Sequence, residues 1–235
     1  MRGRLLRLTM AALFAALAVA LAITIGACGD STTSSESTSP AVSDENPIKI
    51  GAIVSLTGTY AGLGQPEKNV LEMEVAKIND AGGINGRKLE VIYEDDATDE
   101  AKAVAATAKL IEQDDVIAII GATGSGQTMA MRGDVQRAEI PQVSMAGATV
   151  ITNPVDPLVF ATPWSNTIVV PFTLDYLKKQ NITKIGLITD SGGFGKDGQA
   201  VLVADAPDAG IKIVADETFN PGDSDMTAQI TKIKN

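Results

Sequence analysis

Histidine is absent from this 235-residue sequence, and Cys28 is its only cysteine. Without histidine, the chain has no imidazole for general base catalysis and no Ser-His-Asp or Cys-His nucleophile. A single cysteine cannot form an internal disulfide or a Cys/His zinc site. These absences remove the commonest catalytic and metal-binding groups, so we expect a protein that is not an enzyme, with no catalytic residues and no metal site.

Basic residues are also scarce, because 19 lysines and arginines stand against 29 aspartates and glutamates, for a formal charge of -10. Such a surface repels the phosphate backbone of nucleic acids, so we expect no nucleic acid as a partner. Acidity of this size otherwise indicates only that the protein stays in solution.

The first 28 residues have the layout of an export signal. Arg2, Arg4 and Arg7 precede an apolar stretch over residues 9–25, which small residues and Cys28 follow. The apolar stretch is slightly short for a membrane span of about 20 residues, and an uncleaved anchor is the alternative. The tetrapeptide "IGAC" resembles the lipobox of bacterial lipoprotein signals. This resemblance implies cleavage after residues 1–27, the signal peptide, and diacylation of the Cys28 sulfur.

Residues 28–46 are rich in Ser, Thr and Pro and contain little that could be buried. This composition predicts a disordered tether. A lipid, a spacer and a globular part together predict an extracytoplasmic protein anchored to the bacterial cell membrane, on its periplasmic side or outer surface.

From Pro47 onward, short β-branched apolar runs alternate with helix-like segments. Strands are predicted over residues 48–54, 88–95, 115–121, 141–147, 158–163, 184–190 and 212–219. Helices are predicted over residues 67–83, 98–113 and 165–180, after residue 121, from about residue 194, and over residues 222–235. This alternation indicates an α/β fold with doubly wound parallel sheet. Ligands of such sheets bind beyond the carboxyl ends of the strands, which here lead into residues 55–64, 94–99, 121–128, 144–149 and 190–195.

The last predicted helix has no strand after it, although a right-handed crossover expects one. We therefore expect this sequence to be part of a longer protein, cut inside a second domain.

Two glycine-rich turns resemble nucleotide motifs. "GATGSGQT" (residues 121–128) has Gln127 where a phosphate-binding loop needs lysine. "GFGKDG" (residues 193–198) fits G-x-G-x-x-G, with Asp216 near the end of the following strand. An exported protein has no reliable supply of either nucleotide, so we expect no cofactor and favour a tight turn into a helix. A nucleotide-dependent oxidoreductase built on "GFGKDG" is the remaining alternative.

The loop "GATGSGQT" suits capture of a carboxylate. Free amides at a helix N-terminus attract anions, Gly124 and Gly126 permit close approach, and the Ser125 hydroxyl can donate a further hydrogen bond. The loop "SMAGATVIT" presents carbonyls and the Thr149 hydroxyl, which suit an ammonium group. Together the two loops predict an amino-acid site, and the alternative is that both are ordinary Gly/Ser turns.

The order of these loops is similar to that of a known family. "SLTGTYAGLG", "INDAGGINGRKLEVIYEDD", "IIGATGSGQT", "IPQVSMAGAT" and "ITDSGGFGKDG" follow one another as in the extracellular solute-binding proteins of branched-chain amino acid ABC transporters. The resemblance implies a type I periplasmic-binding fold, in which two doubly wound parallel-sheet lobes close on a ligand cleft. Here the lobes would comprise residues 47–163 and, incompletely, residues 164–235.

The resemblance also implies roles for single residues. Ser125 stands where the family holds the ligand carboxylate, with Gly126 beside it. Phe194 stands where the second lobe offers an aromatic ring, and Leu63 where many members carry one, with Tyr60 as its alternative. The segment that supplies a carbonyl and a hydroxyl to the ligand covers Ala146, Ala148 and Thr149. The acid and aromatic that complete the family's site would lie beyond Asn235.

The function implied by the resemblance is that of the substrate-binding component of an ABC importer. Such a protein, expected to be a monomer, captures an apolar amino acid such as leucine, isoleucine or valine and delivers it to permease subunits in the membrane. A receptor module of the same fold for an amide, urea or aromatic acid is the alternative.

Three further features have structural interpretations. "EDDATD" (residues 94–99) does not fit the calcium-loop pattern, so we expect a strand end followed by a helix that Thr98 could cap. Trp164 and Tyr176 are expected to be packing residues. Pro171 is expected to kink its helix or to delay its start.

Overall fold

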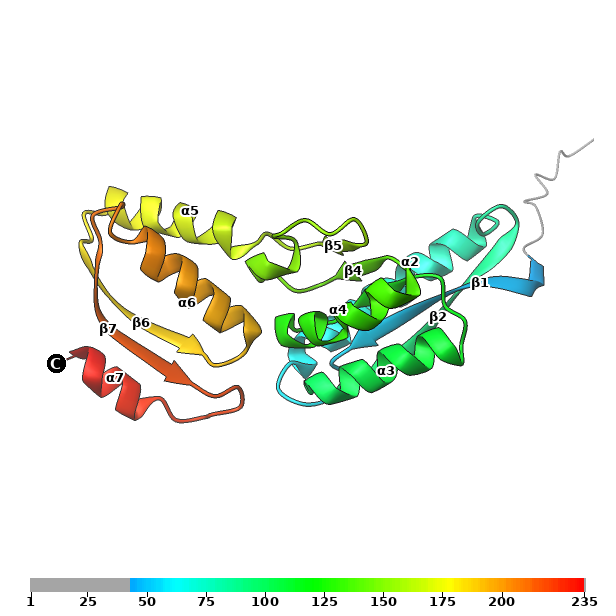
Figure 1. The fold of residues 1–235 in the computed structure, drawn as a ribbon, viewed down its shortest axis with the longest axis horizontal. Coiled ribbons are helices and arrows are strands. Elements are labelled where there is room, and N and C mark those ends of the chain that lie inside the picture. The colour runs from blue at the N-terminus through cyan, green and yellow to red at the C-terminus, as the bar shows by residue number, and fades with distance from the viewer. Residues whose placement is uncertain (1–42, 235) are drawn as a thin grey trace, which may run out of the picture. The chain divides into compact units, whose positions relative to one another are not determined.

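The computed structural model describes residues 43–234 (Figure 1). The predicted signal peptide, the lipid attachment at Cys28 and most of the predicted tether lie outside the described residues. No helix of the described part combines the length and the apolar character that a membrane crossing needs.

The first sheet has five parallel strands in the order β2-β1-β3-β4-β5. These are β1 (Ser43–Val54), β2 (Arg87–Asp95), β3 (Ile119–Gly121), β4 (Gln142–Ser144) and β5 (Val159–Ala161). The order reverses between β1 and β3, which is the point where doubly wound sheets bind ligands. The predicted α/β fold with parallel sheet is thus confirmed, although β1 begins five residues before the predicted strand.

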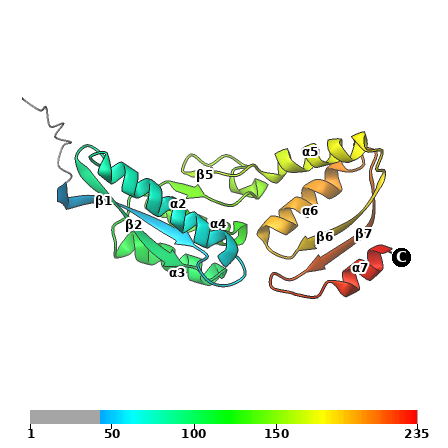
Figure 2. The ribbon, with the colours of Figure 1, turned by 180° about the vertical axis from the view of Figure 1, so that it is seen from behind.

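Helices cover both faces of this sheet. They are α2 (Ala61–Asp80), α3 (Glu100–Glu112), α4 (Ser125–Ala138) and the short 3-10 helix η1 (Thr149–Ile151). Figures 1 and 2 show α2 on one face and the pair α3 and α4 on the other. Leu110 of α3 and Met131 of α4 are fully buried in one apolar cluster with Ile53 of β1 and Ile119 of β3. This cluster fixes the start of α4 relative to the ends of β1 and β3.

The second sheet pairs β6 (Lys184–Asp190) with β7 (Lys212–Phe219) in parallel. Around it lie α5 (Asn166–Lys179), α6 (Gly193–Asp205) and α7 (Thr227–Lys234). Val170 and Leu174 of α5 are buried with Ala206 and Ile211, and Ile185 packs on this cluster. Gly186 faces Ile233 of α7 instead. Since neighbouring strand residues point to opposite faces, α7 lies on the other side from α5.

The structure corrects three predictions about where helices begin and what caps them. α2 begins at Ala61, six residues before the predicted start, and contains Pro66. α5 begins five residues before Pro171, so the prediction that this proline delays the start is wrong. The prediction that Thr98 caps α3 is also wrong. Asp99 is the N-cap, and its side chain accepts a hydrogen bond from the Lys102 amide at 2.8 Å.

The start of α2 lies directly against the end of β1. Gly64 is buried, and a Cβ atom on it would lie 2.2 Å from the Ser55 carbonyl oxygen. Only a residue without a side chain permits this contact. Gly62, two residues earlier on the same helix, has no atom within 4 Å of such a position.

We expect Gly64→Ala to lower the free energy of unfolding by about 1–3 kcal/mol, because the methyl group must push α2 away from β1. Gly62→Ala is the matched control and should stabilise the protein by about 0.5–1 kcal/mol, since alanine favours the helix. Chemical denaturation of both variants measures the two changes. Equal effects of the two substitutions would contradict the close contact.

Candidate ligand-binding site

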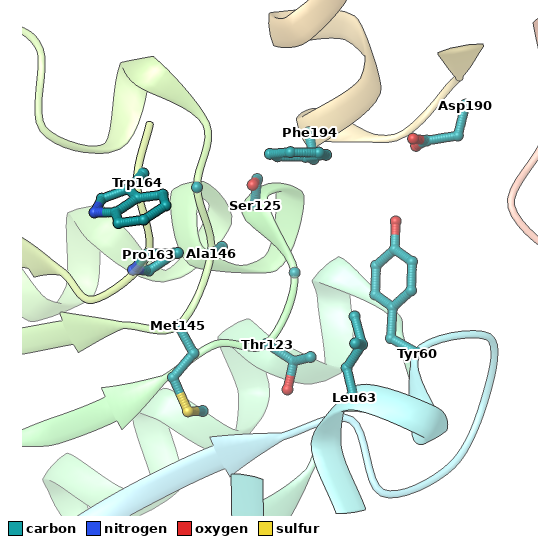
Figure 3. A pocket seen from close by; sticks show the side chains of 12 residues that line it. Tyr60, Leu63, Thr123, Ser125, Met145, Ala146, Pro163, Trp164, Asp190 and Phe194 are labelled. Atoms are coloured by element: carbon teal, nitrogen blue, oxygen red, sulfur yellow. The ribbon is translucent and has the colours of Figure 1, made fainter. Parts of the chain in front are cut away.

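A cavity of about 280 Å³ lies beyond the carboxyl ends of the strands (Figure 3). Each of its five wall segments follows a parallel strand, in the order β1, β3, β4, β5 and β6. The lining residues are Tyr60, Leu63, Thr123, Gly124, Ser125, Met145, Ala146, Gly147, Pro163, Trp164, Asp190 and Phe194. Apolar walls with a few polar groups are typical of small-molecule sites.

The first polar group is the start of α4. Ser125 is the first residue of this helix, Gly124 is the N-cap, and no side chain caps the helix end. The Ser125 hydroxyl oxygen accepts a hydrogen bond from the Ala148 amide at 3.3 Å, which leaves its proton free to donate. A helix N-terminus carries partial positive charge. This end of the cavity therefore suits a carboxylate or another oxygen acceptor.

Thr123 also lines the cavity, but its hydroxyl is used inside the protein. It accepts a hydrogen bond from the Ser55 amide at 3.0 Å and donates one to Glu67 at 2.6 Å. The Ser55 hydroxyl donates to the fully buried Asp96 at 2.6 Å. Burial raises the pKa of Glu67, the hydrogen bond from Thr123 lowers it, and the negative charge of Asp96 raises it further, with a net increase. These bonds fix the ends of β1 and β3 against each other.

Asp95 holds the loop after β1 in place. Its carboxylate accepts hydrogen bonds from the Leu56, Thr57 and Ala97 amides and from the Thr57 hydroxyl at 2.6–3.2 Å. Burial raises the pKa of Asp95, but the hydrogen bonds from Thr57, Ala97 and Leu56 lower it more, and the net change is downward. The acidic stretch 94–99 therefore supports the loop. Within residues 43–234, no group of three or more acidic, histidine or cysteine side chains could hold a metal ion.

Four of the predicted ligand-binding residues line the cavity, namely Ser125, Ala146, Phe194 and Leu63. Tyr60 lines it together with Leu63, so both candidates for the first loop are present. Trp164 was expected to be a packing residue, but it is 77% exposed and forms part of the wall, so that expectation is wrong. Tyr176 is 58% exposed on α5 and does not line the cavity, so it is not a buried packing residue either.

The structure places three other predicted residues outside the cavity wall. Gly126 lies against Gly193 of α6, because a Cβ atom on Gly193 would be only 2.7 Å from the Gly126 amide nitrogen. Ala148 is buried in a small apolar cluster with Ile151. The Thr149 amide donates to Asp197 at 2.8 Å, and the Thr149 hydroxyl is buried without a hydrogen-bond partner. Contact of these residues with a ligand stays a prediction.

Gly124, which the sequence analysis placed in the carboxylate loop, also lines the cavity, and sequence reasoning missed six other lining residues. Thr123, Met145 and Gly147 stand in loops that the strand ends had marked, so their loop position was the available signal. Asp190 is the last residue of β6 and begins the marked stretch 190–195. Pro163 ends the predicted strand 158–163 and Trp164 follows it, but the loop after this strand was not among those marked.

The chain belongs to the periplasmic binding protein family, whose pattern matches residues 47–235. It is 30% identical over 189 residues to a leucine-, isoleucine-, valine-, threonine- and alanine-binding protein of Pseudomonas aeruginosa, covering 80% of this chain and 50% of that protein. The chain thus spans about half the length of the curated relatives it matches.

Solved structures agree with this assignment. One is a branched-chain amino acid transporter substrate-binding protein from Streptococcus pneumoniae in complex with isoleucine, with 32% identity and a TM-score of 0.71 over 81% of this chain and 54% of that one. Another is an ABC transporter solute-binding protein from Rhodopseudomonas palustris in complex with 3,4-dihydroxybenzoic acid, with 25% identity and a TM-score of 0.73 over 80% and 51%. The type I periplasmic-binding fold implied by the resemblance is confirmed, and the relatives with this fold are solute-binding proteins.

A partly buried ion pair joins α4 to the segment after η1, and a further hydrogen bond joins α4 to η1 itself. Arg132 of α4 donates to Asp156 at 3.1 Å and to the Val150 carbonyl at 3.2 Å. A hydrogen bond from the Leu158 amide, followed by bonds from Gln136 and Arg132 and by the Arg132 charge, lowers the pKa of Asp156 despite its burial. The stabilisation from this group is therefore complete above the unfolded-state pKa of about 3.9 and is lost as the pH falls through the lower folded-state value.

We expect Asp156→Asn to be less stable than the parent protein at pH 7, with a difference that shrinks as the pH falls below about 4. Urea denaturation at several pH values measures this. Asp175→Asn is the control, because its ion pair with Lys179 is exposed and such pairs contribute little. A difference that stays constant down to pH 2 would contradict the role of the Asp156 charge.

Proposed function

We propose that the protein is the extracytoplasmic solute-binding component of an ABC importer, which captures an apolar amino acid and delivers it to the permease. The observation that carries the proposal is the cavity at the start of α4. It combines the free Ser125 hydroxyl and the helix N-terminus with apolar walls from Leu63, Met145 and Phe194. The first group suits the ligand carboxylate, and the walls suit an aliphatic side chain.

The two solved relatives support an amino acid or another small carboxylate as the ligand. Isoleucine, in the complex from Streptococcus pneumoniae, and 3,4-dihydroxybenzoic acid, in the complex from Rhodopseudomonas palustris, both carry a carboxyl group. The Ser125 end of the cavity could receive that shared group. The rest of the wall would then set the preference between side chains.

In the proposed mechanism, the wall segments after β1, β3 and β4 bind the ligand first, and the segment after β6 closes over it. Phe194 of α6 would cover the ligand from the second sheet. Binding would then shift the population from an open to a closed form, which the permease recognises. A sensing module of the same fold for an amide, urea or aromatic acid is the second candidate, favoured by the aromatic Trp164 in the wall.

Isothermal titration of the full chain against amino acids and aromatic acids tests the function. We expect at least one amino acid to bind, and Ser125→Ala to weaken its affinity about 10-fold or more, because a hydrogen bond to a charged group is lost. Ser224→Ala, at an exposed loop position, is the matched control and should bind normally. Binding of aromatic acids alone would favour the second candidate, and unchanged affinity of Ser125→Ala would remove the carboxylate role.

We also propose that the mature protein is held at the membrane by lipid on Cys28, as its "IGAC" sequence suggests. Expression in bacteria should then place the parent protein in the membrane fraction and should label it with radioactive palmitate. Cys28→Ser should abolish the label and leave the precursor uncleaved. Labelling that persists in Cys28→Ser would disprove attachment at this residue.

A further inference from the structure

Asp190 is the only charged residue that lines the cavity, as far as the described residues show. It is the last residue of β6, and its Oδ1 atom accepts a hydrogen bond from the Gly192 amide at 2.8 Å. The Oδ2 atom accepts no hydrogen bond from residues 43–234 and lies beside Gly195 of α6, 2.4 Å from the place that a Cβ atom on Gly195 would occupy. This contrasts with Asp95, whose carboxylate accepts four hydrogen bonds from the loop it supports. Asp190 is therefore a cavity-lining carboxylate with one oxygen that accepts no hydrogen bond from the protein.

Tyr60 faces Asp190 from the other sheet. Figure 3 shows the Tyr60 ring directed toward the Asp190 carboxylate, whereas Trp164 and Met145 lie on the opposite side of the cavity. The Tyr60 hydroxyl lies 3.0 Å from the place that a Cβ atom on Gly192 would occupy. Burial and then the negative charge of Asp190 raise the pKa of Tyr60. The hydroxyl thus stays protonated, and it makes no hydrogen bond within the described residues.

The cavity consequently has two polar ends. The start of α4 with Ser125 offers hydrogen-bond donors, and the corner formed by Asp190 and Tyr60 offers a carboxylate acceptor beside one hydroxyl. A purely aliphatic ligand would fill the space between these ends but would remove water from Asp190 without replacing its hydrogen bonds. Desolvating a charged group in this way is costly.

We propose that Asp190, with Tyr60 beside it, accepts a hydrogen bond from the ligand side chain. The preferred ligand is then an amino acid whose side chain carries a hydroxyl, amide or ammonium donor, in place of a purely aliphatic one. This inference rests on the proposed capture of an amino acid in the same cavity, and it replaces the apolar side chain proposed above by one that carries a hydrogen-bond donor. Asp190 acts as a specificity-determining residue, because a site that binds a donor discriminates strongly against the analogue without it.

Pairs of amino acids with nearly equal shape test the proposal. The full chain is titrated with valine and threonine, with leucine and asparagine, and with alanine and serine. We expect the donor-bearing member of at least one pair to bind about 10-fold or more tightly than its aliphatic partner. Asp190→Ala should reduce that ratio to about 1 or invert it. Tyr60→Phe should reduce it less, because the carboxylate remains.

Asp216→Asn is the matched control. This carboxylate lies on β7, accepts a hydrogen bond from Gln199 and does not line the cavity, so the ratio should stay unchanged. Tighter binding of the aliphatic member in every pair would overturn the proposal, and this measurement needs no variant. The proposal would also fail if Asp190→Ala weakened the binding of both members of a pair equally, because this result would indicate that Asp190 contacts the α-ammonium group. Absence of binding by all amino acids would instead reject the proposed function.

Discussion

Parallel alignment of the strands is the constraint on which the rest of this structure depends. Because β1, β3, β4 and β5 all run in the same direction, the loops that follow them emerge at one edge of the sheet. β6 adds a fifth loop from the second sheet, and the five loops line one cavity. Hydrogen bonds then hold the loops of the first sheet at fixed positions, as Asp95 does for the loop after β1. The cavity is therefore a consequence of the topology before any side chain contributes chemistry.

The alternation of strands and helices could be predicted because it depends on local periodicity, and most predicted elements are found close to their expected bounds. The start of α2 could not be predicted, because its first six residues include Gly62, Gly64 and Pro66 and resemble a loop. Gly64 is there because Ser55 lies against it, and that contact joins two elements whose approach no local pattern reveals. The predicted cap of α3 was wrong by one residue, because Thr98 and Asp99 are adjacent and both residue types can cap a helix. Thr98 adopts a left-handed conformation with φ of 65°, so the helix can begin only after it.

Some residues of the candidate site could be found from the local sequence, whereas others are placed by contacts between distant segments. Ser125 could be found from sequence because a strand, a glycine-rich turn and a helix N-terminus are consecutive in the chain. Gly126 belongs to the same turn, but Gly193 of another element covers it. Trp164 and Asp190 reach the cavity only through the path of the chain between the two sheets. Their contribution depends on contacts such as the hydrogen bonds from Thr149 and Asn166 to Asp197, which join segments far apart in sequence.

An acidic chain offers many carboxylates, and composition alone cannot say which of them face a ligand. The number of hydrogen bonds that each accepts from its own protein separates them. Asp156 is bound by Arg132, Gln136 and a backbone amide, and Asp197 is bound by an amide and an asparagine side chain. Such groups are structural, since a ligand would have to displace bonds that hold the loops. Asp190 accepts a single amide hydrogen bond at the cavity wall, and its other oxygen lies beside Gly195 without one, so a ligand could bind that oxygen without displacing a hydrogen bond of the fold.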